Sequence, residues 1–167
     1  MIPIIAHRTC PLHTPENSLA GIRKAGELHA DGVEVDVRRT LELVRERNLE
    51  PRVLMWSYRE AAVRYFAEQA PEIESALLRD DVDPEGLRRF LEDATAFGAR
   101  AISAHYAAIT PQLVAEAHQR KLRVYSWIRD LETVEKKVSM GLDGIVTNEP
   151  AEVRAILSKE SAVGTDL

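Results

Sequence analysis

The segment VEVDVRRTLELVRERNLEPRVLMW (Val33–Trp56) contains one complete strand–helix–strand repeat, from which the rest of the chain can be interpreted. Its first residues alternate valines with Glu34 and Asp36, the period-two pattern of a strand whose two carboxylates share one face. Residues 41–48 then read as a helix and 52–56 as a second apolar strand. A strand, a crossover helix and a strand in succession predict parallel pairing.

The same alternation runs along the whole chain. Strands are predicted at residues 3–6, 32–37, 52–56, 74–78, 100–104, 122–127 and 144–146, and helices at 15–28, 41–48, 60–69, 84–97, 111–120, 131–140 and 151–157. Thr14 and Thr110 are the predicted N-caps of the helices that follow them, and the tail from Ser158 is expected to fray. Strands that are apolar on both faces indicate a parallel sheet covered by helices.

Two architectures fit this pattern: a barrel and a doubly wound open sheet. The turn after the first strand, Ala6–Thr9, lacks the glycine-rich phosphate loop of dinucleotide-binding sheets. Polar residues follow many of the strands instead, and the active sites of β/α barrels gather at those carboxyl ends. We therefore predict the α/β class and a TIM-type (β/α) barrel with seven units, a derivative of (β/α)8.

Composition limits the function classes. The 167 residues are 45% hydrophobic and 29% charged, which predicts one globular domain over residues 1–167. A net charge of −5 predicts no general binding of nucleic acid, and no stretch approaches the roughly 20 apolar residues of a transmembrane helix. The N-terminus does not resemble a signal peptide, and the single cysteine, Cys10, excludes an intrachain disulfide, so we expect a cytoplasmic location.

Four residues at strand ends could carry chemistry. His7 and Arg8 suit acid/base work on a phosphate, since imidazole moves a proton and guanidinium holds an anion; the plainer interpretation is a histidine bonded to a backbone carbonyl. Glu34 and Asp36 would face the barrel interior, where two carboxylates stay charged only beside a cation. A hard divalent cation, Mg²⁺ or Ca²⁺, is the natural partner. The alternative is an internal salt bridge to Arg8 or Arg38.

Together these features resemble a known family. AHR (6–8), PENS (15–18) and EVD (34–36) match the His-Arg, Pro-Glu-Asn-Thr/Ser and Glu-x-Asp motifs of glycerophosphodiester phosphodiesterases, in order and at similar spacing. The later segments that also resemble this family are PRVLMWSY (51–58), QAPEIESALL (69–78), TPQLVAEAHQRKLRVYSWIRD (110–130) and MGLDGIVTNEP (140–150). The resemblance covers about residues 3–157.

The resemblance implies a hydrolase of lipid metabolism: a (β/α)8-type barrel that uses a divalent cation to convert glycerophosphodiesters into glycerol 3-phosphate and an alcohol. His7 would be a catalytic acid/base and Arg8 the catalytic, phosphate-binding arginine, with Glu34 and Asp36 as metal ligands. Trp127 would line the pocket over the glycerol moiety. The family mechanism uses the substrate's own glycerol hydroxyl as the nucleophile and passes through a cyclic phosphate, which tethering favours.

The chain departs from the family pattern after Thr40. The family's Asp-Gly-x-x-Val-x-x-His-Asp and Glu-x-Lys motifs, which carry a second catalytic His and a third acidic ligand, are not found. The missing stretch equals about one βα unit, in agreement with the count of seven. His105 could replace the missing histidine. Thr9 stands where the family has Gly, so its side chain could crowd the phosphate or force a different φ.

Shortening has physical consequences. A cation with fewer carboxylates binds more weakly, and a barrel that lacks a unit either closes differently or leaves a gap after the second strand. A gap would expose strand edges and allow a homodimer through them. Activity on a small-molecule glycerophosphodiester is one hypothesis. The alternatives are an inactive relative that binds phosphorylated small molecules or serves as a structural barrel, and a join at Thr40–Leu41 that is not the natural one.

Overall fold

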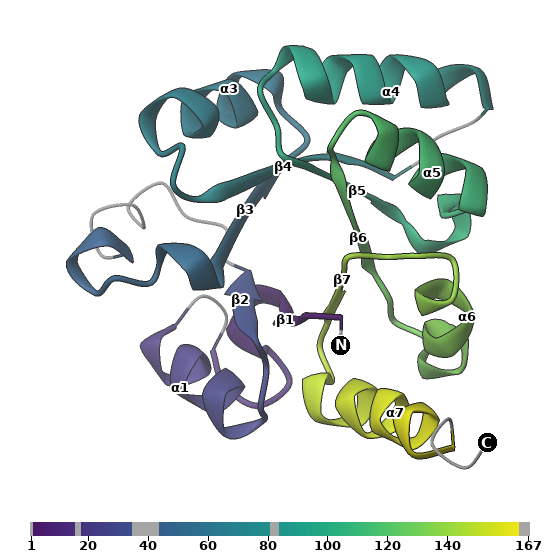
Figure 1. Cartoon of the computed structure of the whole chain (residues 1–167). Helices are drawn as coiled ribbons and strands as arrows, with labels where there is room; N and C mark the ends of the chain where they lie inside the picture. The colour runs from purple at the N-terminus through teal and green to yellow at the C-terminus, as the bar shows by residue number, and fades with distance from the viewer. Residues whose placement is uncertain (1, 16–17, 35–43, 81–83, 164–167) are drawn as a thin grey trace.

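A computed structural model describes residues 2–15, 18–34, 44–80 and 84–163. Within them, parallel strands form a closed barrel in sequence order, with the last strand paired to the first (Figure 1). The strands are β1 (Ile4–Ala6), β2 (Gly32–Glu34), β3 (Val53–Ser57), β4 (Glu74–Arg79), β5 (Ala101–His105), β6 (Arg123–Trp127) and β7 (Gly144–Thr147). The predicted TIM-type barrel with seven strands is confirmed.

Helices surround the barrel on its outside (Figure 1). They are α1 (Leu19–Glu27), α3 (Glu60–Gln69), α4 (Pro84–Ala96), α5 (Pro111–Gln119), α6 (Val134–Val138) and α7 (Pro150–Val163), and residues 44–46 are also helical. Short 3₁₀ turns are η1 (His7–Thr9), η2 (Glu50–Arg52), η3 (Tyr106–Ala108) and η4 (Leu131–Thr133). In the part of the chain that the structure describes, no helix is long and apolar enough to cross a membrane.

Two apolar layers hold the strands in place. Leu91, Ile102, Val124 and Ile145 belong to a buried cluster between the strands and the helices. A second cluster fills the barrel: Ile5, Leu54, Ala76, Ala101, Tyr125 and Val146. Because side chains alternate along a strand, one strand serves both layers, which explains why these strands are apolar on both faces. The interior is thus a packed core, as in other barrels of this type.

Strand β2 pairs directly with β3, so the predicted alternative of an open gap is wrong. Val33 lies opposite Val53 and Glu34 opposite Leu54, while β2 also pairs with β1 on its other side. Every described strand therefore has two neighbours, and the free edge on which we based a homodimer is absent from the described strands. Residues 35–37, the rest of the predicted second strand, lie outside the described residues.

The first helix starts later than predicted, and Thr14 is not its cap. Ser18 is the N-cap, and its side chain accepts a hydrogen bond from the Gly21 N–H at 3.0 Å. The Thr14 hydroxyl instead donates to the carbonyls of Thr9 and Cys10, so the loop after β1 takes this side chain. The other predicted cap, Thr110, is confirmed by a 3.1 Å bond from the Leu113 N–H.

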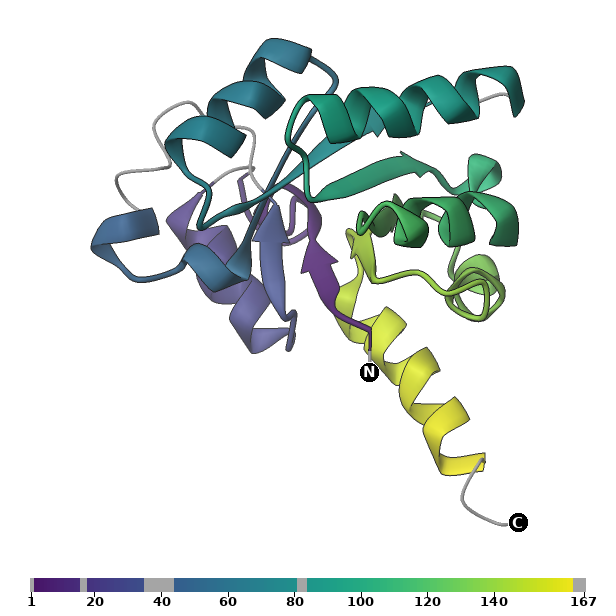
Figure 2. The same ribbon diagram turned by 45° about the horizontal axis from the view of Figure 1, so that its top comes forward.

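The last helix extends further than predicted. Helix α7 continues to Val163, six residues beyond the predicted end, and Figure 2 shows its second half running away from the barrel. Val153 and Leu157 are buried and hold its first half against the core. The small and polar residues from Ser158 onward favoured fraying, but helix propagation adds a hydrogen bond for each residue fixed.

Gly21 is required by the close approach of the first loop. A Cβ at this position would overlap the Thr9 carbonyl oxygen and hydroxyl. We expect Gly21→Ala to lower the free energy of unfolding by about 1–3 kcal/mol, the cost of overpacking, in urea denaturation. The matched control is Gly26→Ala in the same helix, where nothing lies within 4 Å of the new Cβ. Gly26→Ala should be neutral or raise stability by up to about 1 kcal/mol; equal effects of the two variants would contradict this reason.

Candidate active site

A pocket of about 550 Å³ lies at the carboxyl ends of the strands. It is lined by His7, Arg8, Glu34, Trp56, Ser57, Tyr58, Arg59, Leu78, Arg79, Asp80, Ser103, Ala104, His105, Trp127 and Arg129. These residues come from the ends of β1 to β6 and the loops that follow them. Four residues predicted from the sequence, His7, Arg8, Glu34 and Trp127, meet in this one pocket. The fifth, Asp36, lies outside the described residues.

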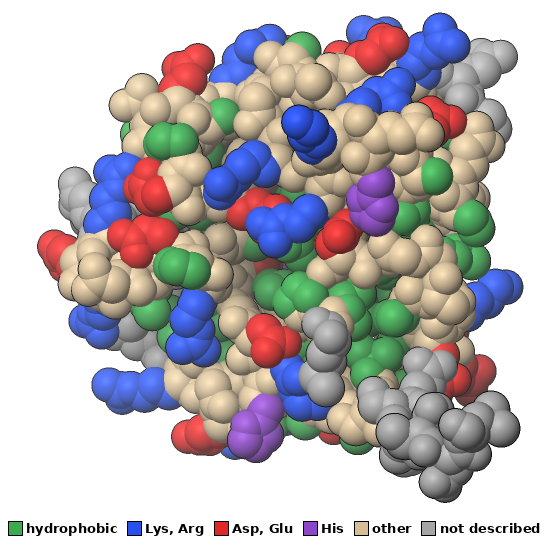
Figure 3. Space-filling model, in the orientation of Figure 1, with side chains coloured by type: hydrophobic (Ala, Val, Ile, Leu, Met, Phe, Trp, Pro, Cys, Tyr) green, Lys and Arg blue, Asp and Glu red, His purple; other side chains and the backbone are tan. Residues whose placement is uncertain are grey.

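The opposite mouth holds a smaller pocket of about 390 Å³, in which charged side chains pair with one another. Buried Glu74 accepts a hydrogen bond from the Tyr125 hydroxyl at 2.8 Å and pairs with Arg123 at 2.5 Å. Burial raises the pKa of Glu74, which the bonds from Tyr125 and Arg123 oppose. Figure 3 shows acidic and basic side chains intermingled around this mouth. Such pairing is typical of a structural end of the barrel, so the candidate site is the other mouth.

The His7–Arg8 pair sits on an unusual turn. Arg8, Thr9 and Cys10 all have positive φ, at 42°, 59° and 63°, a region that non-glycine residues rarely adopt. Thr9 thus holds the left-handed conformation that glycine adopts most easily, so the threonine does not move the backbone out of that region. Its side chain does not line the pocket: it is fully buried, and its hydroxyl accepts the Ser18 N–H at 3.1 Å. The strained turn presents His7 and Arg8 to the pocket.

His7 is oriented by contacts from distant parts of the chain. Its Nδ1 lies 3.0 Å from Oδ1 of Asn148, just beyond β7. Its ring stacks on Trp127 with centroids 4.7 Å apart and an interplanar angle of 29°, and Trp56 approaches edge-on at 6.4 Å. The described contacts of His7 are thus a side-chain amide and two indole rings. An imidazole held on three sides is positioned for one direction of proton transfer.

Glu34 points into the barrel mouth, as its place in the strand predicts, and only 1% of its surface is exposed. Its Oε2 accepts the Arg8 backbone N–H at 2.9 Å, and its Oε1 accepts the Trp56 indole N–H at 2.6 Å. Each carboxylate oxygen of Glu34 therefore has a donor from a different part of the chain. The neighbouring Val33 packs with Ala25 of α1, on the other face of the strand. The described bond to Arg8 is thus to its backbone, while Arg38 lies outside the described residues.

The sequence predicts Glu34 and Asp36 as ligands of a divalent cation. Among them, no group of three or more His, Cys, Asp or Glu side chains could hold a metal ion. Glu34 is the predicted ligand that the structure places, and its carboxylate is the hard oxygen donor that Mg²⁺ and Ca²⁺ prefer. Mg²⁺ is commonly held by one or two carboxylates together with water and substrate phosphates, so this donor fits such an ion.

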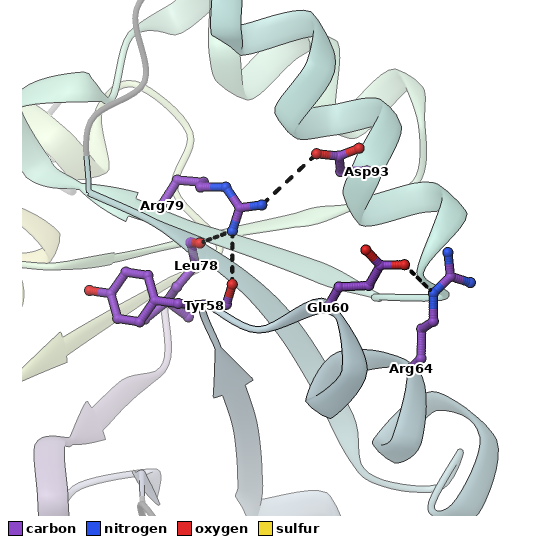
Figure 4. Close-up of polar contacts among 6 residues, drawn as sticks. All are labelled: Tyr58, Glu60, Arg64, Leu78, Arg79 and Asp93. Carbon is purple, nitrogen blue, oxygen red and sulfur yellow. Dashed lines mark hydrogen bonds and ion pairs between the residues drawn. The ribbon is translucent and has the colours of Figure 1, made fainter.

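Several pocket residues were not predicted from the sequence. Figure 4 shows Arg79, at the end of β4, reaching the carbonyls of Tyr58 and Leu78, at 3.1 and 2.9 Å, and approaching Asp93 of α4 at 3.9 Å. The Tyr58 hydroxyl donates to Asp80 at 2.7 Å. Partial burial, with this bond, raises the pKa of Tyr58 to about 12. Their positions just after β3 and β4 were the only sequence signal for these residues.

The remaining candidates fall into two groups. His105 lines the pocket, and its Nδ1 accepts the Ala107 N–H at 3.3 Å, so its predicted role in proton transfer stays a prediction. Cys10 is fully buried. Burial and the nearby Glu149 raise the pKa of its thiol, which disfavours the reactive thiolate form.

The sequence is similar to proteins of a known family. The family model for the glycerophosphoryl diester phosphodiesterase family matches residues 7–45 and 39–152. A glycerophosphodiester phosphodiesterase from Caldanaerobacter subterraneus subsp. tengcongensis is 26% identical over 137 residues, which are 81% of this chain and 54% of that protein. The chain thus spans about half the length of this curated relative.

Solved structures show the same fold. One from Silicibacter pomeroyi DSS-3, assigned to the glycerophosphoryl diester phosphodiesterases, has a TM-score of 0.65 and 25% identity, and the match covers 84% of this chain and 54% of that one. A phosphodiesterase from Oleispira antarctica, solved with the product sn-glycerol-3-phosphate, has a TM-score of 0.73 and 15% identity over 93% and 96% of the two chains. With most of its length matched by the family model, the chain belongs to the glycerophosphoryl diester phosphodiesterase family.

Proposed function

We propose that this protein is a metal-dependent phosphodiesterase that hydrolyses glycerophosphodiesters to glycerol 3-phosphate and an alcohol. The observation that carries the proposal is that His7, Arg8 and Glu34 lie in one pocket and are held there by hydrogen bonds and ring contacts. The Arg8 N–H is bonded to Glu34, and His7 is bonded to Asn148 and stacked on Trp127, all in one pocket. Family membership supports the same reaction.

His7 is the proposed acid/base. With Asn148 Oδ1 as the acceptor, the ring proton resides on Nδ1, and Nε2 is the atom that exchanges a proton with substrate. The glycerol 2-hydroxyl attacks phosphorus and gives up its proton, the bond from phosphorus to the alcohol oxygen breaks, and the alcohol leaves protonated. Water then opens the cyclic phosphate to glycerol 3-phosphate. Arg8 is the proposed phosphate-binding residue, and Trp127 lines the glycerol moiety.

The leaving alcohol departs on the side of phosphorus opposite the nucleophile, so it needs a proton source of its own. His105 lines the same pocket as His7 and is the other histidine among its described lining residues. We therefore assign to His105, rather than to a water molecule, the donation of a proton to the leaving alcohol. Glu34, with Asp36, would hold the divalent cation, whose charge would offset that of the phosphate oxygens. Each carboxylate oxygen has two acceptor lone pairs, so a hydrogen bond to an oxygen is compatible with its coordinating a cation.

The wider setting follows from the same proposal. Residues 1–167 would act as one barrel domain, and the substrates would be small molecules derived from phospholipids. A cytoplasmic location is consistent with the single buried cysteine. The competing idea of an inactive binding relative is the less favoured one, because His7, Arg8, Glu34 and Trp127 line the same pocket.

The test is release of glycerol 3-phosphate by the purified chain from glycerophosphocholine, glycerophosphoethanolamine and glycerophosphoglycerol. We expect turnover that rises with Mg²⁺ or Ca²⁺ and stops with a chelator. The background is the His7→Ala variant, which carries the same contaminants through purification. If no diester is turned over above this background at saturating metal, the proposed function is wrong.

A further inference from the structure

Arg129 occupies a position that the reaction described above does not use. It lies two residues beyond the end of β6, lines the active-site pocket and is exposed. Its guanidinium carbon is 4.2 Å from the centre of the Trp127 ring. A cation above an indole is attracted by the ring and is thereby held against the pocket wall. The side chain is thus fixed in place at the pocket by an aromatic contact.

The contact with Trp127 leaves the hydrogen-bond donors of Arg129 unused. Within the described ranges, its guanidinium has no hydrogen bond or ion pair, in contrast to Arg79, whose Nη1 donates to two carbonyls. The adjacent carboxylate, Asp130, caps η4 by accepting the Glu132 N–H at 3.0 Å. A guanidinium carries five N–H donors, so those of Arg129 are available to a ligand in the pocket.

The described lining of the pocket carries more basic than acidic side chains, although the chain has a net charge of −5. Its described lining includes four arginines, Arg8, Arg59, Arg79 and Arg129, against the two carboxylates of Glu34 and Asp80. Glu34 already accepts two N–H groups and Asp80 accepts the Tyr58 hydroxyl. A cleft lined by one sign of charge concentrates ligands of the other sign.

We infer that Arg129, held on Trp127, is a second phosphate-binding residue of this site. The inference rests on the proposed function, because it names a further group that recognises the phosphate of that substrate and of its product. A guanidinium binds phosphate oxygens through paired, charge-assisted hydrogen bonds. Arg129 binds the phosphate similarly in substrate and product, so it contributes to affinity more than to the chemical step.

The experiment measures binding of glycerol 3-phosphate and of inorganic phosphate by calorimetry, with Arg129→Gln, Arg129→Lys and wild type. We expect Arg129→Gln to raise the Kd of glycerol 3-phosphate at least about tenfold, as for loss of a hydrogen bond to a charged group. Arg129→Lys should recover part of this loss, because lysine keeps the charge without the paired donors. Arg89→Gln, which removes the same charge from exposed α4, is the control and should match wild type.

Turnover separates this inference from the proposed function. If the chain hydrolyses glycerophosphocholine, Arg129→Gln should raise KM by a similar factor and leave kcat within about threefold. Wild-type turnover with an unchanged KM and Kd in Arg129→Gln would overturn the role of Arg129 and keep the function. If wild type shows no turnover but Arg129→Gln binds phosphate more weakly, the proposed function is wrong and the role of Arg129 in phosphate binding is kept. A wild type that binds neither phosphate probe overturns the inference.

Discussion

Replacing His7 with glutamine is expected to lower kcat/KM for glycerophosphocholine by about 10²–10⁴-fold, the usual contribution of a positioned acid or base. Glutamine has a similar reach and can still bond to Asn148, but it cannot exchange a proton near neutral pH. The imidazole is held by Asn148, Trp127 and Trp56, so the substitution removes a positioned acid/base group. The measurement is the steady-state rate of glycerol 3-phosphate release at saturating metal.

The control for this loss is His118→Gln on α5. His118 lies 2.7 Å from Asp143 outside the pocket, and an exposed pair of this kind contributes little to stability. This variant should keep kcat/KM within about twofold of wild type. Binding of glycerol 3-phosphate to His7→Gln should change far less than turnover. Retention of a tenth or more of wild-type activity by His7→Gln would exclude His7 as the acid/base.

Strand and helix positions were accessible from the sequence because they depend on local periodicity. Glu34 faces the barrel interior because valine and acidic residues alternate along its strand. Trp127 and His7 line the pocket because both stand at the ends of strands. Closure of the barrel was not accessible in this way. Whether β2 pairs with β3 depends on packing around the whole ring, and the opposite outcome was equally compatible with the residues.

The partners within the site were harder to predict than its positions. Asn148 is 141 residues from His7, and Trp56 is 22 residues from Glu34; no local pattern identifies either pair. The start of α1 was misassigned because Thr14 and Ser18 are both good caps. Ser18 is the cap because the left-handed turn at Arg8–Cys10 takes the Thr14 hydroxyl as a hydrogen-bond donor. The same turn places Thr9 against Gly21. Sequence patterns give the face of a residue, whereas the fold gives its partner.

Glu34→Gln is the second variant with a large expected effect, because its two oxygens have separate donors. Oε2 accepts the Arg8 N–H and Oε1 accepts the Trp56 indole N–H. An amide has one oxygen, so its NH₂ group must face one of these donors in a site with 1% exposure. The buried unpaired donor should lower the free energy of unfolding by about 1–3 kcal/mol in urea denaturation. The amide also removes the negative charge that the proposed cation needs, so turnover should fall at least about a hundredfold.

A double-mutant cycle with Trp56→Phe separates these two effects. Phenylalanine removes the indole donor, so the NH₂ group introduced by Glu34→Gln no longer opposes it, and the double variant should be more stable than the sum of the two single losses predicts. Thermal unfolding with and without Mg²⁺ or Ca²⁺ gives the second readout: the metal should raise the Tm of wild type and of Trp56→Phe, and of neither variant that carries Glu34→Gln. Stability restored without metal binding would show that Glu34 has two roles, as the acceptor that fixes the His7–Arg8 turn and as a ligand. A metal-induced rise in Tm that persists in Glu34→Gln would exclude the second role, and strictly additive losses would exclude the donor conflict as the cause of the first.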